Sequence, residues 1–347
     1  MGRPGTRPSA RRPARWPDPR SRLSVTTAGD GTPARTIFLG SGGFAVPILE
    51  ALIAAPEVVL VAVVTAPDRP AGRHGRLHST PIAARAAELG LPVLTPAWIR
   101  DAAVIASIAA LQPALGVLAD YGRIVPQALL DVPLHGILNV HPSLLPRHRG
   151  ATPIPAAILA ADPVTGVTVI QMDAGLDTGP IVAAESWLLS GSETAPIIEA
   201  QAAAVGARII RALLAGWLAG QLPAQPQDER AATLTRPLGR EDGRLDPARP
   251  ALELERAVRA YLPWPGTFLD TPRGRLAVRA ATVEPAAPGD VAGSVVEDDL
   301  GLALVTVADR LRLLEVQPAG GRSMSAAAYL RGRVGRAGLD GWSLADA

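Results

Sequence analysis

The alternation of apolar strands with helices between residues 36 and 140 is the feature that most limits how this chain can fold. The sequence predicts strands at 36–40, 58–64, 114–118 and 136–140, and helices at 44–55, 81–89, 102–111 and 125–130. Strands that alternate with helices form β-α-β units with parallel strands. We therefore predict an α/β domain with a Rossmann-like open, mostly parallel sheet. Ligands of such sheets bind at the carboxyl ends of the strands.

The rest of the chain indicates a second, smaller domain. The first domain is completed by helices and strands at 153–159, 167–172, 180–186 and 194–219. A polar stretch punctuated by prolines follows and reads as a linker. After a helix at 251–261, short β-type segments separated by Gly, Pro and Asp predict a small OB-like β-barrel. The predicted parts are an Arg- and Pro-rich disordered tail (1–33), a first domain (34–221), a linker (222–240), a barrel (241–335) and a tail (336–347).

The residue types that the sequence lacks exclude several kinds of chemistry. All 34 basic residues are arginines, and there is no cysteine. Disulfides, thiolate nucleophiles, cysteine zinc sites and a Schiff-base or P-loop lysine are therefore excluded. The formal net charge is only +2, so any contact with nucleic acid must come from local patches. Because no apolar run approaches a membrane span and the N-terminus has no apolar signal region, we expect a cytoplasmic protein without a membrane partner.

Asn139 and His141 stand two residues apart, where the strand at 136–140 is ended by Pro142. Side chains alternate along a strand, so these two project from the same face. A buried amide and a buried imidazole both need hydrogen-bond partners, and a shared site explains their pairing better than two separate structural roles. The pair suits acyl transfer, because the amide can stabilise an oxyanion and the imidazole can move a proton.

A carboxylate would complete this site by orienting the imidazole or by holding a water molecule. The Gly-containing loop between the strands at 167–172 and 180–186 offers two carboxylates, Asp173 and Asp177. Either could also be an ordinary turn aspartate. Sequence spacing alone does not choose between them.

A glycine-rich turn after the first strand supports a rival function. Residues 40–45 read Gly-Ser-Gly-Gly-Phe-Ala, which fits the G-x-G-x-x-A fingerprint of dinucleotide binding. Asp68 follows the second strand, a little later than the acid that usually binds the ribose. The pattern would suit an NAD-dependent oxidoreductase, although nothing further along the chain supports hydride transfer.

A basic loop at 68–76 lies beside the predicted carboxyl edge of the sheet and contains Arg69, Arg73 and Arg76. A run of charged residues is usually a solvated surface loop. Because this loop lies beside the ligand-binding edge of the sheet, contact with phosphate groups is an equally good interpretation.

Taken together, these segments resemble the folate-dependent formyltransferases, and within that family most closely the enzymes that formylate methionyl-tRNA. The resemblance covers nearly the whole chain from about Arg35 to Arg331. The matching segments are the first strand-to-helix turn, the basic loop, the Asn-x-His core motif, the Asp-containing loop and a Pro-Trp-Pro-Gly motif, at residues 40–47, 65–73, 139–150, 172–180 and 263–266. The core motif marks the wider family, whereas the basic loop, the linker and the barrel point to the branch that acts on tRNA.

The resemblance implies a catalytic trio of Asn139, His141 and Asp177, and so selects Asp177 over Asp173 for catalysis. It implies that 10-formyltetrahydrofolate is the co-substrate, with no metal, and that the folate is held by Ser143, Leu144, Leu145, Pro146, Tyr121 and Asp173. It also implies that methionyl initiator tRNA is the partner of a monomeric enzyme and is contacted by Arg69, Arg73, Arg76 and Arg236.

The chain departs from the family pattern at two of these places. Asp120 stands beside Tyr121 where the family often has a small apolar residue, and Arg236 stands where the linker usually has a lysine. Within the same chemistry, the sequence leaves other acceptors open, namely glycinamide ribonucleotide, an amino sugar or water.

Overall fold

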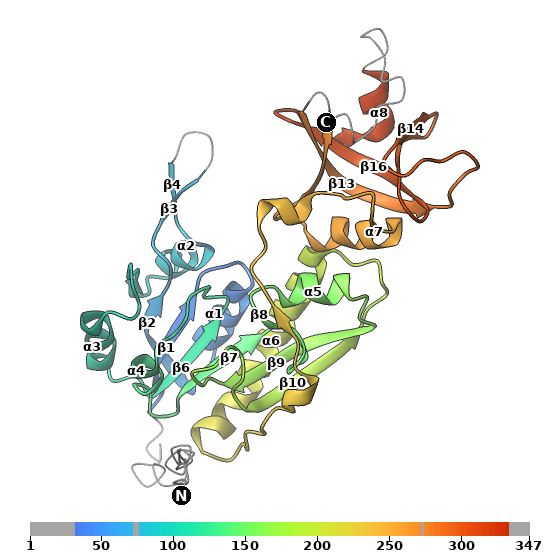
Figure 1. The fold of residues 1–347 in the computed structure, drawn as a ribbon. Coiled ribbons are helices and arrows are strands. Elements are labelled where there is room, and N and C mark those ends of the chain that lie inside the picture. Colours follow the sequence, from blue (N-terminus) through green and yellow to red (C-terminus); the bar gives the residue numbers. More distant parts are fainter. Residues whose placement is uncertain (1–31, 72–75, 272–273, 333–347) are drawn as a thin grey trace, which may run out of the picture.

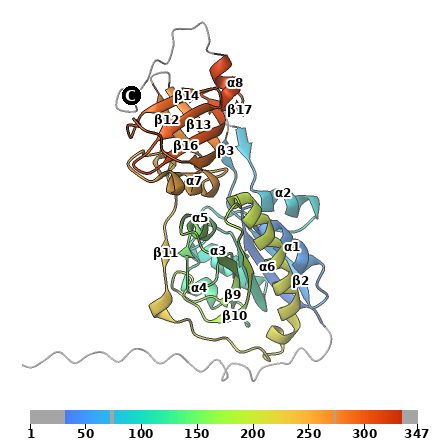
Figure 2. The same ribbon diagram turned by 90° about the vertical axis from the view of Figure 1, so that its right-hand side faces the viewer.

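The computed structural model describes residues 32–71, 76–271 and 274–332. Figures 1 and 2 show an α/β domain joined by an extended segment to a smaller β domain. Most of the two expected tails and the tip of the basic loop, including Arg73, lie outside the described residues. The first domain contains β1 (Ala34–Gly40), α1 (Ala45–Ile53), β2 (Val58–Val64), β3 (Arg69–Ala71), β4 (Arg76–His78), α2 (Pro81–Glu88), β5 (Val93–Leu94), α3 (Ala102–Ala110), β6 (Leu115–Ala119), α4 (Gln127–Leu130), β7 (Ile137–His141), β8 (Arg149–Gly150), α5 (Pro153–Leu159), β9 (Val164–Gln171), β10 (Ile181–Leu188) and α6 (Ala195–Leu218).

The described strands of this domain form a main sheet in the order β10-β9-β7-β6-β1-β2-β5. The pairs from β7 to β5 are parallel, whereas β7–β9 and β9–β10 are antiparallel. The predicted α/β class and mostly parallel sheet are confirmed. The antiparallel pairing of β9 with β10 follows from the short connection between Gln171 and Ile181 in sequence, because a parallel pair needs a longer crossover.

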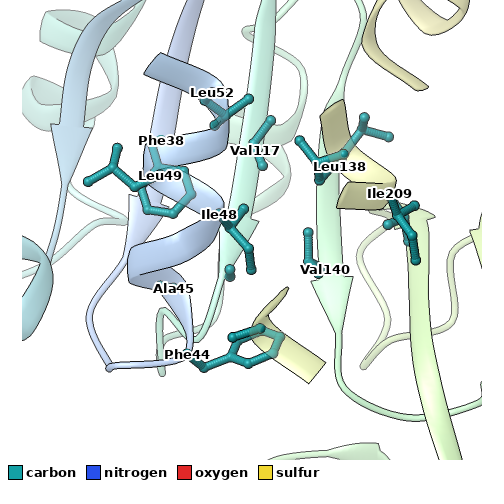
Figure 3. Close-up of a cluster of buried hydrophobic side chains, with 14 of the residues drawn as sticks. Phe38, Phe44, Ala45, Ile48, Leu49, Leu52, Val117, Leu138, Val140 and Ile209 are labelled. Atoms are coloured by element: carbon teal, nitrogen blue, oxygen red, sulfur yellow. The ribbon is translucent and has the colours of Figure 1, made fainter. Parts of the chain in front are cut away.

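Both faces of the sheet are buried, which explains why its strands are continuously apolar. Phe38, Val117, Leu138 and Val140 pack with α1 and α6 on one face, as Figure 3 shows. Their strand neighbours, including Ile37, Leu118 and Ile137, pack on the opposite face. Because side chains alternate along a strand, Asn139 and His141 share the face of Ile137.

The segment predicted to be a linker lies along the first domain on its way to the second. Its β11 (Leu234–Thr235) pairs in parallel with β8, and Gln225 forms a backbone bridge with Ile181. It also contains two short 3-10 turns, η2 (Glu229–Ala231) and η3 (Arg240–Gly243). The polar, proline-rich composition gave no sign of these contacts, because they are made by backbone groups and side chains far apart in sequence.

The second domain contains α7 (Ala251–Ala260), β12 (Thr267–Thr271), β13 (Gly274–Glu284), β14 (Val295–Asp298), β15 (Gly301–Val305), β16 (Arg310–Pro318), β17 (Met324–Ser325) and α8 (Ala326–Arg331). Its strands pair antiparallel in the order β12-β13-β16-β15-β14, with β17 against β16. The predicted small β domain is therefore present. Ala257, Ala260 and Tyr261 pack with side chains of α5 and α6, so the two domains share a small apolar cluster. In the described part of the chain, no helix is long and apolar enough to span a membrane.

Candidate functional site

A cavity of about 890 Å³ opens at the carboxyl end of β7. Its lining includes the end of β7, the segment after β6, the loop between β9 and β10, the first turns of α6 and part of the second domain around Trp264. Both domains therefore contribute to one site. Asn139 and His141 line the cavity, where their position at the end of a sheet strand led us to expect a ligand.

Asn139, His141 and Asp177 meet in the wall of this cavity. The side-chain amide of Asn139 donates a hydrogen bond of 3.0 Å to Asp177 Oδ1, and the backbone N–H of Gly150 donates one of 2.8 Å to Asp177 Oδ2. Asp177 Oδ2 also lies 3.5 Å from His141 Nδ1. The carboxylate thus touches both residues of the Asn-x-His pair and is held by a backbone donor that the sequence analysis did not single out.

The contacts of His141 fix which of its ring nitrogens can exchange a proton. Nε2 lies 2.9 Å from the backbone oxygen of His148. A carbonyl oxygen only accepts hydrogen bonds, so Nε2 carries the hydrogen in the neutral ring. Nδ1 is then the free acceptor, and it faces Asp177.

The environment keeps His141 neutral at physiological pH. The residue is only 4% exposed, and this burial lowers the pKa of its imidazole below the usual value. The negative charge of Asp177 acts in the opposite direction and stabilises the protonated ring. His141 is therefore ready to accept a proton at Nδ1, and Asp177 makes that acceptance easier.

Asp173, the other carboxylate of the loop, has a different role. Its Oδ1 accepts hydrogen bonds from the backbone N–H of Gly175 and the hydroxyl of Thr178, both within the loop. It therefore shapes the turn, whereas Asp177, four residues later, reaches Asn139. The contacts therefore place Asp177, and not Asp173, beside the Asn139 and His141 side chains.

The residues expected around a folate fall into two groups. Tyr121 and Asp173 line the cavity, but Ser143, Leu144, Leu145 and Pro146 are not part of the lining in the described structure. The Ser143 hydroxyl donates to the Arg147 carbonyl, and the Leu145 N–H donates to Thr168 on β9. Leu144 packs closely over Gly166 on the same strand. These contacts hold the 143–146 turn against the sheet, beside the cavity rather than in its wall.

Asp120 occupies the space beside the glycine-rich turn after β1 and accepts the hydrogen bonds of the turn's backbone. The backbone N–H groups of Ser41 and Gly42 both donate to the backbone oxygen of Asp120, at 2.9 and 3.3 Å. A Cβ atom on Gly42 would lie 1.6 Å from an Asp120 carboxylate oxygen, so only glycine fits there. Burial and the nearby charge of Glu199 raise the pKa of Asp120 to about 6. In its ionised form this carboxylate opposes the binding of a phosphate at the turn.

Of the arginines expected to contact tRNA, Arg69 and Arg236 are described with their side chains, and neither lines the cavity. Arg69 is exposed at the start of β3, and Arg76 begins β4, so the basic loop is a β hairpin around the undescribed Arg73. Figures 1 and 2 show this hairpin and the second domain projecting from the same side of the first domain. Arg236 is exposed, but its guanidinium is bound to the carboxylate of Asp242.

The described residues contain no group of three or more His, Asp or Glu side chains that could hold a metal ion. The polar groups that line the cavity include an amide, an imidazole and carboxylates. These groups can bind, polarise and move protons on an organic substrate.

Two family models match the chain. The model described as "Formyl transferase" matches residues 34–213, and the model described as "Formyl transferase, C-terminal domain" matches residues 237–334. The boundary between the two matches falls within the segment that passes from α6 to the second domain.

Curated relatives match over nearly their whole length. The methionyl-tRNA formyltransferase of Chloroflexus aggregans is 45% identical over 304 residues, which cover 86% of this chain and 97% of that protein. The methionyl-tRNA formyltransferase of Paramagnetospirillum magneticum is 46% identical over 301 residues, with 86% and 97% covered.

Solved structures share the fold at much lower identity. HypX from Aquifex aeolicus, in complex with tetrahydrofolic acid, has a TM-score of 0.60 at 15% identity and covers 88% of this chain and 48% of its own. The sugar 3N-formyltransferase WlaRD, with dTDP and 5-N-formyl-THF, has a TM-score of 0.60 at 14% identity and covers 82% of this chain and 98% of its own.

Proposed function

The chain belongs to the methionyl-tRNA formyltransferase family, and we propose that it moves the formyl group of 10-formyltetrahydrofolate to the α-amino group of methionyl initiator tRNA. The main support for this proposal is that Asn139, His141 and Asp177 contact one another in the wall of one cavity. Those three groups supply the hydrogen-bond donor and the proton acceptor that acyl transfer to an amine requires.

Asn139 is proposed to stabilise the oxyanion of the tetrahedral intermediate. The α-amino group has a pKa near ~8, so a useful fraction is neutral and nucleophilic at neutral pH. Its attack on the formyl carbon turns the carbonyl oxygen into an oxyanion. One N–H of the Asn139 amide is bound to Asp177, and the other remains for this oxygen.

His141 is proposed to move the proton that the reaction releases. The attacking amine must lose a proton, and N10 of the folate must gain one as the bond between the formyl carbon and N10 breaks. Nδ1 can take the amine proton directly or through a water molecule, and the resulting imidazolium is stabilised by Asp177. The same group can then return the proton to N10.

The part of the cavity between the β6–α4 segment and the Asp177 loop is proposed to hold the folate. Tyr121, Val125 and Met172 present apolar surface there, and Asp173 adds a carboxylate at the rim. Flat ligands are commonly held by apolar walls with a few polar groups that fix their orientation. The opening toward Trp264 and the second domain is left for the aminoacyl end of the tRNA.

The state of the glycine-rich turn weighs against two alternatives. A pyrophosphate in an NAD-dependent oxidoreductase would need free N–H groups there, but Ser41 and Gly42 already donate to Asp120. Any other acceptor that placed a phosphate at this turn would meet the same occupied donors and the Asp120 carboxylate. An acceptor whose phosphates bind elsewhere, such as a tRNA, avoids this conflict.

A transfer assay tests the proposed function directly. The protein is mixed with 10-formyltetrahydrofolate that carries a labelled formyl group and with methionyl initiator tRNA, and label in the aminoacyl-tRNA is measured. We expect label on the initiator tRNA and much less on methionyl elongator tRNA. Labelled formate without labelled tRNA would instead indicate a hydrolase, and no release of label would remove the proposal.

The basic hairpin is expected to bind the phosphates of the tRNA. Replacing both Arg73 and Arg76 with alanine should raise the KM for tRNA several-fold, while the KM for the folate stays unchanged. Two lost phosphate contacts should also flatten the slope of log kcat/KM against log salt by about 2. Kinetics at several salt concentrations check this.

A matched double variant, Arg100→Ala with Arg208→Ala, removes the same charge from exposed positions outside the hairpin and the cavity lining. If this double variant changes the tRNA kinetics as much as the hairpin variant does, the hairpin has no special role and is only solvated surface.

A further inference from the structure

The segment 225–235, which we call the strap, lies against the loop that carries Asp177. It is attached at one end by the backbone bridge of Gln225 to Ile181 and at the other by the pairing of β11 with β8. The backbone N–H and hydroxyl of Thr233 add contacts to Pro146 and His148. The strap is therefore fixed to the first domain on both sides of the catalytic loop.

Gln227 is the strap residue that reaches the catalytic loop. Its side-chain amide nitrogen donates to the backbone oxygen of Asp177 at 2.8 Å and to the backbone oxygen of Gly179 at 2.7 Å. Both amide hydrogens are used by these two carbonyl groups. One side chain thus holds the backbone of the loop at the catalytic aspartate itself.

The loop needs such a restraint because its backbone is unusual at this point. Asp177 has a φ of +52°, in the left-handed region that non-glycine residues seldom adopt. Aspartate adopts this region more readily than most residues do, but the conformation remains uncommon. It is nevertheless the conformation that places the carboxylate between Asn139 and His141.

Arg149 fixes the orientation of the Gln227 amide. Its Nε and Nη2 atoms donate to Gln227 Oε1 at 3.1 and 2.8 Å, and the same guanidinium also binds Glu229. Arg149 is only 3% exposed. Because the amide oxygen must face Arg149, the amide nitrogen must face the two carbonyl groups of the loop.

We propose that Gln227 is a positioning residue of the formyl transfer, which acts through the backbone of Asp177 to keep its carboxylate against Asn139 and His141 Nδ1. This proposal rests on the function proposed above. Misplacement of a catalytic group by about 1 Å can cost on the order of a hundredfold in rate. The Gln227 side chain therefore supports the site, and the strap that carries it does more than connect the two domains.

Two variants of Gln227 separate its donors from its acceptor. Gln227→Met removes both without adding a charge, whereas Gln227→Glu keeps an acceptor for Arg149 but has no hydrogen for the two carbonyl groups. We expect both variants to lower kcat about tenfold or more, with the KM values for folate and tRNA within twofold of wild type. In Gln227→Met the acid limb of kcat/KM should move to lower pH, because a displaced Asp177 no longer supports the protonated form of His141.

The control variants make the same substitutions at another glutamine of the strap. Gln225→Met and Gln225→Glu make the same changes at an exposed side chain whose contact with Ile181 is made by the backbone, and they should keep the wild-type kcat. Adding Gln227→Met to Asp177→Asn should lower kcat by less than twofold further, since both changes act through the same carboxylate. Melting temperatures of all variants show whether each is folded.

Several results would overturn the proposal. These are near-normal kcat in Gln227→Met, full activity in Gln227→Glu, a multiplicative loss in the double variant, or loss of folding in both Gln227 variants. The wild-type protein is measured in the same assay. An inactive wild type removes the proposed function, whereas an active wild type with an active Gln227→Met removes only this inference.

Discussion

Replacing either Asn139 or His141 with alanine is expected to lower turnover at least a hundredfold while the protein stays folded. The loss of one preorganised donor to an oxyanion typically costs about 10²–10³ in rate, and the loss of a positioned proton carrier about 10²–10⁴. Both side chains line the cavity and contact the same carboxylate. Each change should therefore act on kcat more than on the KM of either substrate.

The measurement is the rate of formyl transfer with both substrates saturating, together with the melting temperature. Some loss of stability is expected, because His141→Ala leaves the His148 carbonyl without its hydrogen bond, and an unpaired buried group costs about 1–3 kcal/mol. His135→Ala is the control, since that half-buried histidine lies outside the cavity lining. Near-normal turnover in a folded Asn139→Ala or His141→Ala would remove the proposed site.

Local patterns in the sequence were enough to predict the frame of the site. The apolar runs and helical periods between residues 36 and 140 predicted β1, β2, β6 and β7 closely, because each strand is buried on both faces and its composition shows it. The alternation of side chains along a strand also predicted that Asn139 and His141 would share a face. These predictions depend only on neighbours in the chain.

Contacts between distant segments could not be predicted in the same way. Gln227 is 50 residues from Asp177 in sequence, and a polar residue in a proline-rich stretch gives no signal of that contact. Similarly, nothing local reveals that the Leu145 N–H donates to Thr168 or that the Asp120 carboxylate fills the space above Gly42. Each of these features depends on how two remote backbones approach each other.

The choice between Asp173 and Asp177 shows what sequence patterns can predict and what only the structure reveals. Both are aspartates of one Gly-containing loop, and composition treats them alike. The left-handed backbone at Asp177 turns its carboxylate toward Asn139, whereas Asp173 is used by Gly175 and Thr178 within the loop. Family resemblance selected Asp177, and in the structure it is Asp177 whose carboxylate lies against Asn139 and His141.

Changing Asp177 to asparagine is expected to lower turnover on the order of a hundredfold or more and to move the acid limb of kcat/KM to lower pH. Asparagine keeps the size of the side chain and one acceptor oxygen but removes the charge. Burial already lowers the pKa of His141, and the Asp177 charge is the main influence that raises it. Without that charge the pKa falls further, so the imidazole accepts the amine proton less readily in the transition state.

The sign of the pH effect distinguishes this mechanism from a merely structural role of Asp177. The neutral ring is the active form of the free enzyme, so kcat/KM declines as pH falls through the His141 pKa. The variant should keep a larger share of its own maximum rate at mildly acidic pH than the wild type does. Asp173→Asn makes the same change within the same loop and should leave the acid limb in place, because Asp173 contacts its own turn. An acid limb that shifts equally in both variants, or in neither, would mean that the Asp177 charge does not control His141.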